Sequence, residues 1–149
     1  MGIFATVRER FPKLAVEQNF SFAAHTTVGC GGTAEAAVQL RNREECVALL
    51  PFLKEKGIDY CFLGMGANVL PCDGVYHGVV VRFGGMRALA REDNTIFAEA
   101  GVTGGGLLRF AAGQHLGGFE HFTGIPMSIG GGVTMNAGIS AGHFSDVVE

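Results

Sequence analysis

The segment "IDYCFLGMGANVL" (Ile58–Leu70) joins a short apolar run to a turn of small residues. The apolar run, residues 58–64, predicts a buried strand, because a short apolar segment that ends at glycine is typical of one. The turn that follows contains Gly64, Gly66 and Asn68. Glycine allows backbone conformations and close approaches that other residues do not. The segment therefore predicts a strand that ends in a loop able to come close to a ligand.

Two familiar phosphate-binding patterns do not fit this loop. The dinucleotide pattern G-x-G-x-x-G lacks its third glycine here, and no helical pattern follows. The G-K-[ST] phosphate loop is also absent. Two interpretations remain, which are a tight turn without a ligand and a nest of successive backbone N–H groups that cradles a diphosphate.

Bulk composition limits the class of protein. The chain has 149 residues and a net charge of −3, which fits one domain or two small lobes and predicts neither a nucleic-acid nor a membrane-surface partner. No apolar run reaches the about 20 residues of a membrane span, and the first residues do not resemble a signal peptide. The cysteines form no C-x-x-C pair or metal-ligand spacing, so we expect no metal site and reduced thiols in a cytosolic protein: Cys30, Cys46, Cys61 and Cys72.

Glycine is the most informative excess, with 24 glycines in the chain. They lie beside apolar residues and show no period, which excludes collagen-like and low-complexity sequences. The same need for close backbone approach recurs in segments far apart in the sequence. This distribution predicts one extended ligand contacted by several loops.

The remaining patterns predict mixed helices and strands. Residues 41–57 predict a helix with Asn42 as N-cap and with Val47, Leu50 and Leu53 on one face. Residues 104–118 predict a second helix that begins with glycines. Because the elements do not follow a regular βαβ repeat, the expected fold class is α+β, with further strands predicted over residues 33–40, 77–83 and 94–101.

The segment "GIPMSIGGGVTMNAG" (Gly124–Gly138) is the second candidate ligand site. Ser128 fits an N-cap for a helix over residues 129–136. Three consecutive glycines inside that helix cost roughly 1 kcal/mol each relative to alanine, which indicates that something packs against the backbone. No Lys or Arg follows Arg109, so an anion bound here would depend on the helix N-terminus and its free N–H groups. Close packing of the helix on a strand is the alternative.

These two segments, together with "HTTVGCGGTAEAAV" (His25–Val38), resemble the FAD-binding domain of the UDP-N-acetylenolpyruvoylglucosamine reductase family. Three motifs occur in order, at Thr27 with Gly31–Ala34, at Leu63–Asn68 and at Ile125–Gly138. The resemblance implies the vanillyl-alcohol-oxidase type of fold, with two α+β lobes and FAD extended between them. It also implies a division into an N-terminal helical segment (1–18), a first lobe (19–86), an incomplete second lobe (87–149) and no substrate-binding C-terminal domain.

The resemblance also implies the cofactor site. Many covalent flavoproteins of this superfamily carry a flavin-linking histidine where this chain has Asn68, so the implied binding of FAD is non-covalent. In the first lobe the diphosphate would be held by Gly64, Met65, Gly66, Ala67, Asn68 and Val69. In the second lobe the flavin and ribityl side would be lined by Gly124, Ile125, Ser128, Gly130, Gly131, Asn136, Ala137 and Gly138.

The activity implied by the family is an oxidoreductase reaction of peptidoglycan synthesis in the cytoplasm, and hence of cell wall biogenesis, cell shape and cell division. NADPH reduces the flavin, and hydride then passes to the enolpyruvyl group of a nucleotide sugar. No catalytic residue is assignable in this chain, so we expect it to be inactive alone. Because the implied second lobe is incomplete, we also expect the chain either to self-associate through that lobe or to be loosely ordered from about residue 117 onward. Two alternatives stay open at this stage, which are another oxidase or dehydrogenase of the superfamily and a cofactor-free glycine-rich module.

Overall fold

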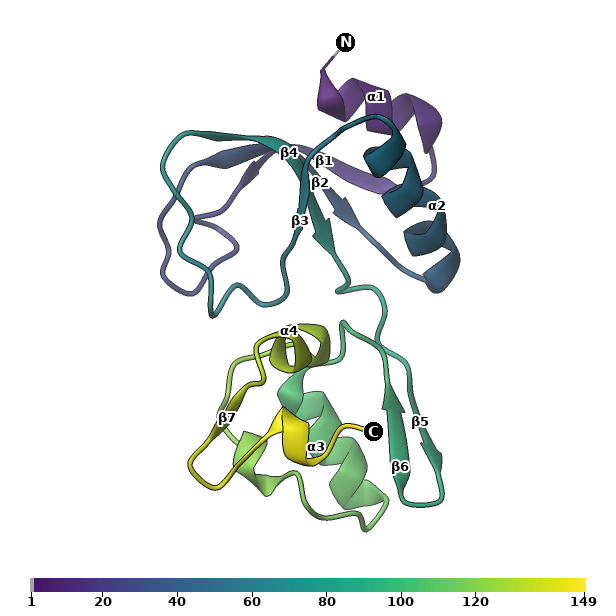
Figure 1. Ribbon diagram of the computed structural model, residues 1–149, viewed down its shortest axis with the longest axis vertical. Coiled ribbons are helices and arrows are strands. Elements are labelled where there is room, and N and C mark those ends of the chain that lie inside the picture. Colours follow the sequence, from purple (N-terminus) through teal and green to yellow (C-terminus); the bar gives the residue numbers. More distant parts are fainter. Residues whose placement is uncertain (1) are drawn as a thin grey trace. The chain divides into compact units, whose positions relative to one another are not determined.

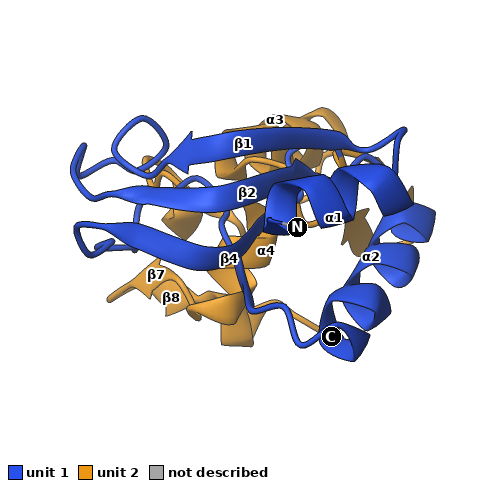
Figure 2. Ribbon diagram, turned by 90° about the horizontal axis from the view of Figure 1, so that it is seen from above, with its two compact units in different colours: residues 1–85 blue, residues 86–149 orange. Residues whose placement is uncertain are grey.

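The computed structural model describes residues 2–149, which form two compact units. Unit 1 ends at Gly85, and unit 2 runs from Met86 to Glu149 (Figures 1 and 2). This division lies one residue before the expected boundary. The N-terminal segment is not separate from the first lobe, because α1 (Ile3–Arg10) packs on the sheet of unit 1 and β1 (Ala15–Ser21) is a strand of it.

Unit 1 is built on one four-stranded sheet in the order β1-β2-β4-β3. β1 is antiparallel to β2, whereas β2, β4 and β3 run parallel. Three strands overlap the predicted apolar segments, at Thr33–Gln39 in β2, Tyr60–Phe62 in β3 and Val75–Arg82 in β4. Alternation places Val80 in a cluster with Phe20 and Ala37 on one face of the sheet, and it directs Val79 and Val81 to the other face.

The first predicted helix is confirmed as α2 (Arg43–Glu55). The Asn42 side chain accepts a hydrogen bond from the Glu45 N–H at 2.9 Å, as an N-cap does. The predicted buried face is wrong at Val47, which is 63% exposed, whereas Leu49 and Leu53 are buried. Residues 49 and 53 are four apart and share a face, and the position of the sheet selects that face rather than the neighbouring one.

β3 is shorter and more exposed than the sequence predicts. It is an edge strand paired only with β4, and Tyr60 and Phe62 are both exposed. Cys61 points the other way, toward the Phe20 cluster. The apolar run is therefore only partly a core strand, and its continuation, Leu63, is the residue that is buried.

Unit 2 has a small core under short elements. The core contains Val102, Leu107, Phe122, Met127, Ile129 and Phe144. The elements around it are the hairpin β5 (Leu89–Glu92) and β6 (Thr95–Ala98), α3 (Gly104–Gly113), the 3-10 turn η1 (Glu120–Phe122), α4 (Ile129–Thr134), the hairpin β7 (Gly138–Ile139) and β8 (Gly142–His143), and η2 (Phe144–Asp146).

α3 begins where the sequence predicts and ends five residues earlier. The Thr103 hydroxyl caps it by accepting from the Gly106 N–H at 3.1 Å. α4 also begins as predicted, because the Ser128 hydroxyl accepts from the Gly131 N–H at 3.3 Å, but it ends at Thr134. Asn136 has φ of 48°, a left-handed conformation that a helix cannot contain.

Candidate functional site

The loop that follows β3 presents a run of free backbone N–H groups. From Gly64 to Asn68, no backbone N–H donates a hydrogen bond to any acceptor within residues 2–149. Gly66 lies in the middle of this run and is buried, whereas the other four residues are exposed. Buried backbone N–H groups are almost always paired, so the unpaired Gly66 N–H is unusual, and the four exposed N–H groups are open to water or to a ligand. Successive N–H groups without protein partners fit a site for an anionic ligand with several oxygen acceptors.

Position 66 requires glycine because a neighbouring loop of the same unit packs directly against it. Its φ is 71°, and a Cβ at this position would lie 2.3 Å from the His25 carbonyl oxygen and 2.8 Å from Cα of Thr26. The sequence predicted that the glycines of this loop allow close approach to a ligand. At Gly66 the structure shows a different reason for glycine, because the close approach is to the protein's own backbone.

The two N-terminal motifs meet in unit 1. The Gly66 carbonyl accepts a hydrogen bond from the Thr27 N–H at 3.1 Å. Farther along, the Gly32 N–H donates to the Cys72 carbonyl at 3.0 Å, and a Cβ at Gly32 would lie 1.8 Å from the Gly74 carbonyl oxygen. The glycines of the first motif thus allow two loops to pack backbone against backbone.

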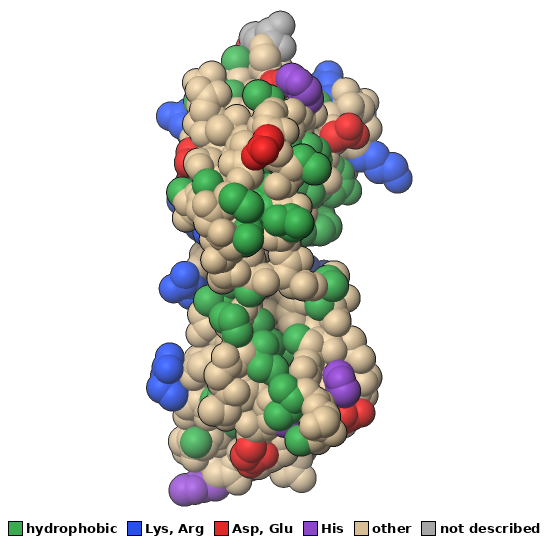
Figure 3. Space-filling model, turned by 90° about the vertical axis from the view of Figure 1, so that its left-hand side faces the viewer, with side chains coloured by type: hydrophobic (Ala, Val, Ile, Leu, Met, Phe, Trp, Pro, Cys, Tyr) green, Lys and Arg blue, Asp and Glu red, His purple; other side chains and the backbone are tan. Residues whose placement is uncertain are grey.

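Exposed apolar side chains lie within and just after the N–H run in the sequence. Met65 is 45% exposed, and Leu70 is 77% exposed. Figure 3 shows that hydrophobic side chains also gather on the surface of each unit. Exposed apolar groups next to unpaired polar groups are typical of a site for an organic ligand.

The start of α4 offers fewer free donors than the sequence predicts. The Ile129 N–H donates to the Val102 carbonyl at 2.7 Å, and the Gly130 N–H donates to the Ala100 carbonyl at 2.9 Å. The Gly131 N–H is taken by Ser128. The expectation of free N–H groups for an anion at this helix end is therefore wrong, because the residues after the β5–β6 hairpin supply the acceptors.

Two of the three consecutive glycines serve close packing. A Cβ at Gly130 would lie 2.8 Å from Cβ of Ala100, and one at Gly132 would lie 2.4 Å from Cε2 of Phe144. Gly131 is less enclosed, with only the Ser128 hydroxyl nearby, at 3.2 Å. The packing interpretation thus accounts for Gly130 and Gly132, and Gly131 is the glycine of the three with most space beside it.

The other predicted residues of unit 2 lie around the same core. Gly124 has φ of 81° and open space at its Cβ position. Ile125 and Ala137 are half-buried and pack on the core cluster. The Asn136 side-chain oxygen accepts from the Ser145 N–H at 2.8 Å, and Gly138 pairs with His143 in the β7–β8 hairpin. These five residues lie before and after α4 within one segment, residues 124–138.

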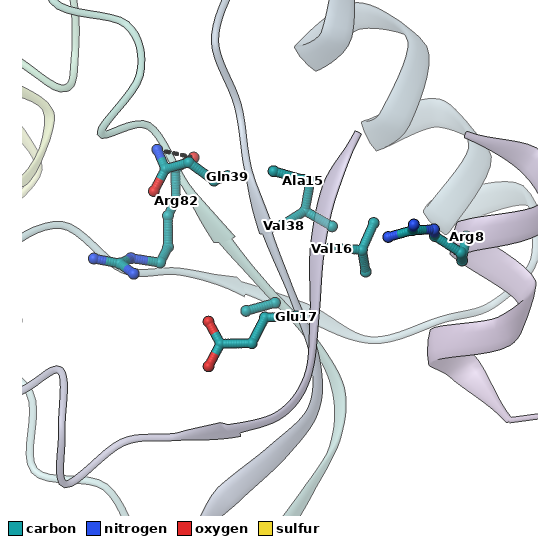
Figure 4. A pocket seen from close by; sticks show the side chains of 8 residues that line it. Arg8, Ala15, Val16, Glu17, Val38, Gln39 and Arg82 are labelled. Atoms are coloured by element: carbon teal, nitrogen blue, oxygen red, sulfur yellow. Dashed lines mark hydrogen bonds between the residues drawn. The ribbon is translucent and has the colours of Figure 1, made fainter. Parts of the chain in front are cut away.

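A separate pocket of about 230 Å³ in unit 1 contains none of the predicted residues. Figure 4 shows Glu17 and Arg82 on one side of β1 and Arg8 on the other. Its charged groups have opposite signs, and its lining is Arg8, Ala15, Val16, Glu17, Ala37, Val38, Gln39 and Arg82. We therefore place the candidate site at the loops and not at this pocket.

The expectations about cysteines, metals and membranes can be compared with the described residues. All four cysteines are free thiols, with Cys30 and Cys72 exposed. No group of three or more metal-ligating side chains occurs within residues 2–149. Across the same residues, no helix has the length and apolar character needed to cross a bilayer.

Sequence reasoning did not identify how the two loops hold each other. It used Thr27 only as a motif residue, whereas the structure shows its N–H bonded to Gly66. It also did not identify Phe144, the core residue against which Gly132 packs. In the sequence, the glycines at positions 66 and 132 were the local indications of these contacts.

Comparison with known proteins identifies relatives that cover most of this chain. UDP-N-acetylenolpyruvoylglucosamine reductase of Moorella thermoacetica is 41% identical over 136 residues, which are 91% of this chain and 45% of that protein. The enzyme of the same name from Geobacillus kaustophilus is 37% identical, over 84% of this chain and 41% of that protein. The chain thus spans about half the length of the curated relatives it matches.

Solved structures agree with this similarity. The crystal structure of UDP-N-acetylenolpyruvylglucosamine reductase from Thermus caldophilus matches with a TM-score of 0.72 and 30% identity, over 89% of this chain and 46% of that one. A solvent-stable cholesterol oxidase matches with a TM-score of 0.60 at 20% identity, over 89% of this chain and 25% of that one, and shows the shared fold alone. These neighbours confirm the expected α+β fold of the vanillyl-alcohol-oxidase type.

The family comparison covers most of both units. The protein-family model described as "FAD binding domain" matches residues 34–149. This range includes the N–H run after β3 and the whole segment 124–138, which contains α4. The cofactor of this family is FAD, as the resemblance implied. The chain therefore belongs to the FAD-binding domain family.

Proposed function

We propose that this chain binds FAD non-covalently and is the FAD-binding portion of a UDP-N-acetylenolpyruvoylglucosamine reductase. The observation that carries the proposal is the run of backbone N–H groups from Gly64 to Asn68, none of which donates to an acceptor within residues 2–149. FAD contains a diphosphate whose oxygens can accept from several such groups at once. The loop contains no Lys or Arg, so oriented backbone dipoles replace side-chain charge.

Each predicted residue has a part in the proposal. In unit 1, Gly64 to Val69 hold the diphosphate, and Asn68, which cannot form the covalent link that a histidine forms, leaves FAD removable. In unit 2, the flavin and ribityl side is lined by Gly124, Ile125, Ser128, Gly130, Gly131, Asn136, Ala137 and Gly138. Because the N–H groups of Gly130 and Gly131 are used within the unit, we infer that this segment contributes shape rather than donors.

The names of the relatives supply the proposed role of the whole protein. We propose an oxidoreductase that uses NADPH as co-substrate and reduces an enolpyruvyl nucleotide sugar in peptidoglycan synthesis, in the cytoplasm. When bound, the flavin supplies hydride transfer. None of the described residues is assigned a catalytic role, so we expect this chain alone not to couple NADPH oxidation to that substrate. Self-association stays a prediction.

Titration of the purified chain with FAD tests the proposal. We expect one FAD per chain, seen as a change in flavin fluorescence, and release of all flavin into solution when the protein is denatured. ADP should compete because it contains the same diphosphate, whereas riboflavin should bind more weakly because it contains none. A chain that binds neither FAD nor ADP would contradict the proposal, and flavin retained after denaturation would contradict the non-covalent assignment.

A further inference from the structure

We propose that the Thr27 backbone N–H is a positioning group that fixes the Ala67 N–H as a donor to a phosphate of the ligand. The inference concerns how the donor array keeps its shape before any ligand binds. It rests on the proposed function, because a diphosphate is the ligand for which the array is arranged.

The turn that contains Thr27 is held firmly to the sheet. The His25 ring stacks on Phe20 at a centroid distance of 4.3 Å, and its Nδ1–H donates to the Ser21 carbonyl at 2.9 Å. The His25 N–H donates to the Phe22 carbonyl, and the Thr26 hydroxyl donates to the same oxygen, both at 3.0 Å. Phe20 is fully buried. These contacts give the turn a fixed position from which it can orient a neighbour.

This turn determines the direction of one peptide group in the 64–68 loop. The Gly66 carbonyl accepts from the Thr27 N–H at 3.1 Å and, at the longer distance of 3.5 Å, from the Thr27 hydroxyl. No peptide bond within the described residues is cis. In a trans peptide the carbonyl and the following N–H point in opposite directions. The Ala67 N–H therefore points away from Thr27, and it donates to no acceptor in the described part of the chain.

Close packing against the turn restricts the loop at Gly66. Gly66 is buried with φ of 71°, and its Cβ position is 2.3 Å from the His25 carbonyl oxygen. The turn backbone thus packs directly on Gly66, and the Thr27–Gly66 hydrogen bond holds the Gly66–Ala67 peptide in the observed orientation. We infer that the donor array is preformed, so that binding a diphosphate requires little ordering of the loop.

Two substitutions of Thr27, by proline and by valine, distinguish the effect of the backbone N–H on ligand affinity from the effect of the side-chain hydroxyl. The Gly29 N–H donates to the Thr26 carbonyl at 3.2 Å, which places Thr27 at the second position of a β-turn. Proline is favoured there, so Thr27→Pro is compatible with the turn. It removes both the N–H and the hydroxyl, and its ring Cδ replaces the hydrogen that pointed at the Gly66 carbonyl. Thr27→Val keeps the N–H and loses the hydroxyl. We expect Thr27→Pro to weaken ADP and FAD binding about tenfold and Thr27→Val to stay within about twofold of wild type.

Amide NMR gives a second, independent measurement on the wild-type chain. In the free chain the Thr27 amide should exchange slowly and the Ala67 amide rapidly. Saturating ADP should shift the Ala67 amide proton downfield and slow its exchange at least tenfold. A folded Thr27→Pro variant with wild-type ADP affinity would overturn the inference, and so would an Ala67 amide that bound ADP leaves unchanged.

The two proposals fail in different ways. If the wild-type chain binds neither FAD nor ADP, the proposed function is wrong. The exchange rates of the Thr27 and Ala67 amides in the free chain then test the loop arrangement by themselves. A protected Ala67 amide or a rapidly exchanging Thr27 amide in the free chain overturns the positioning role whether or not FAD binds. If Thr27→Pro does not fold, the wild-type amide measurements decide.

Discussion

Replacing Gly132 with alanine is expected to destabilise unit 2, because Gly132 lies against the aromatic core. The new Cβ would lie 2.4 Å from Cε2 of Phe144 and 2.9 Å from Sδ of Met127. Both of these side chains are buried, and the Phe144 ring stacks on Phe122 at a centroid distance of 4.3 Å. The ring is therefore packed in the core and cannot yield as a flexible surface side chain would.

The magnitude follows from two opposing effects. Overpacking a core costs about 1–3 kcal/mol, and a contact as short as 2.4 Å belongs in the upper part of that range. Replacing glycine by alanine in a helix gains about 1 kcal/mol. The expected net loss is about 1–2 kcal/mol, which lowers the melting temperature of a chain of this size by about 2–8 °C.

Thermal unfolding followed by circular dichroism measures the loss, with Gly131→Ala as the matched control. A Cβ at Gly131 meets only the Ser128 hydroxyl, at 3.2 Å, so this variant should stay within about 1 kcal/mol of wild type, with helix propensity offsetting the contact. Exchange of the Ala137 amide, which donates to the Gly132 carbonyl at 2.8 Å, reports locally on unit 2. If Gly132→Ala is as stable as Gly131→Ala, the packing explanation for the glycine run is refuted.

Three further predictions concern unit 1. Asn42→Ala should cost about 1 kcal/mol in denaturant unfolding, since it removes the cap of α2, and Asn42→Asp should keep most of it; equal stability of all three proteins would contradict the cap. Burial raises the pKa of Tyr76 from 10.0 to about 12, so the free energy of unfolding should fall as pH rises between these values. Tyr76→Phe should remove that part of the loss, and an equal loss in Tyr76→Phe would contradict the shift. Burial also raises the pKa of the Cys61 thiol, so iodoacetamide at pH 8 should label the exposed Cys30 and Cys72 first in a peptide map; faster labelling of Cys61 would refute this.

Local chemistry explains what the sequence predicted correctly. Asn42 and Ser128 cap α2 and α4 as expected, because a cap needs only a side-chain oxygen and N–H groups a few residues away. The apolar run in β4 forms a buried strand for a similar reason, since its own side chains define it. The α+β class followed from the order of these elements.

Contacts between distant segments account for what the sequence predicted wrongly. Val47 is exposed because the position of the sheet, which the helix pattern does not contain, selects the buried face of α2. The N–H groups at the start of α4 were expected to be free, and carbonyls from residues 100 and 102 accept two of them. No pattern within a short window specifies which carbonyls will lie there.

The 64–68 loop shows both kinds of information in one place. The sequence by itself determined that a glycine-rich turn follows an apolar run, and motif order was sufficient to indicate the FAD-binding domain family; binding of a diphosphate by this loop stays a prediction. Only the tertiary structure decided which groups are free to bind. Gly66 is glycine because the backbone of residues 25–26 occupies its Cβ position, and its carbonyl is taken by the N–H of Thr27, 39 residues away. A peptide group's direction depends on the partner that it meets in the folded chain, and the sequence around it does not name that partner.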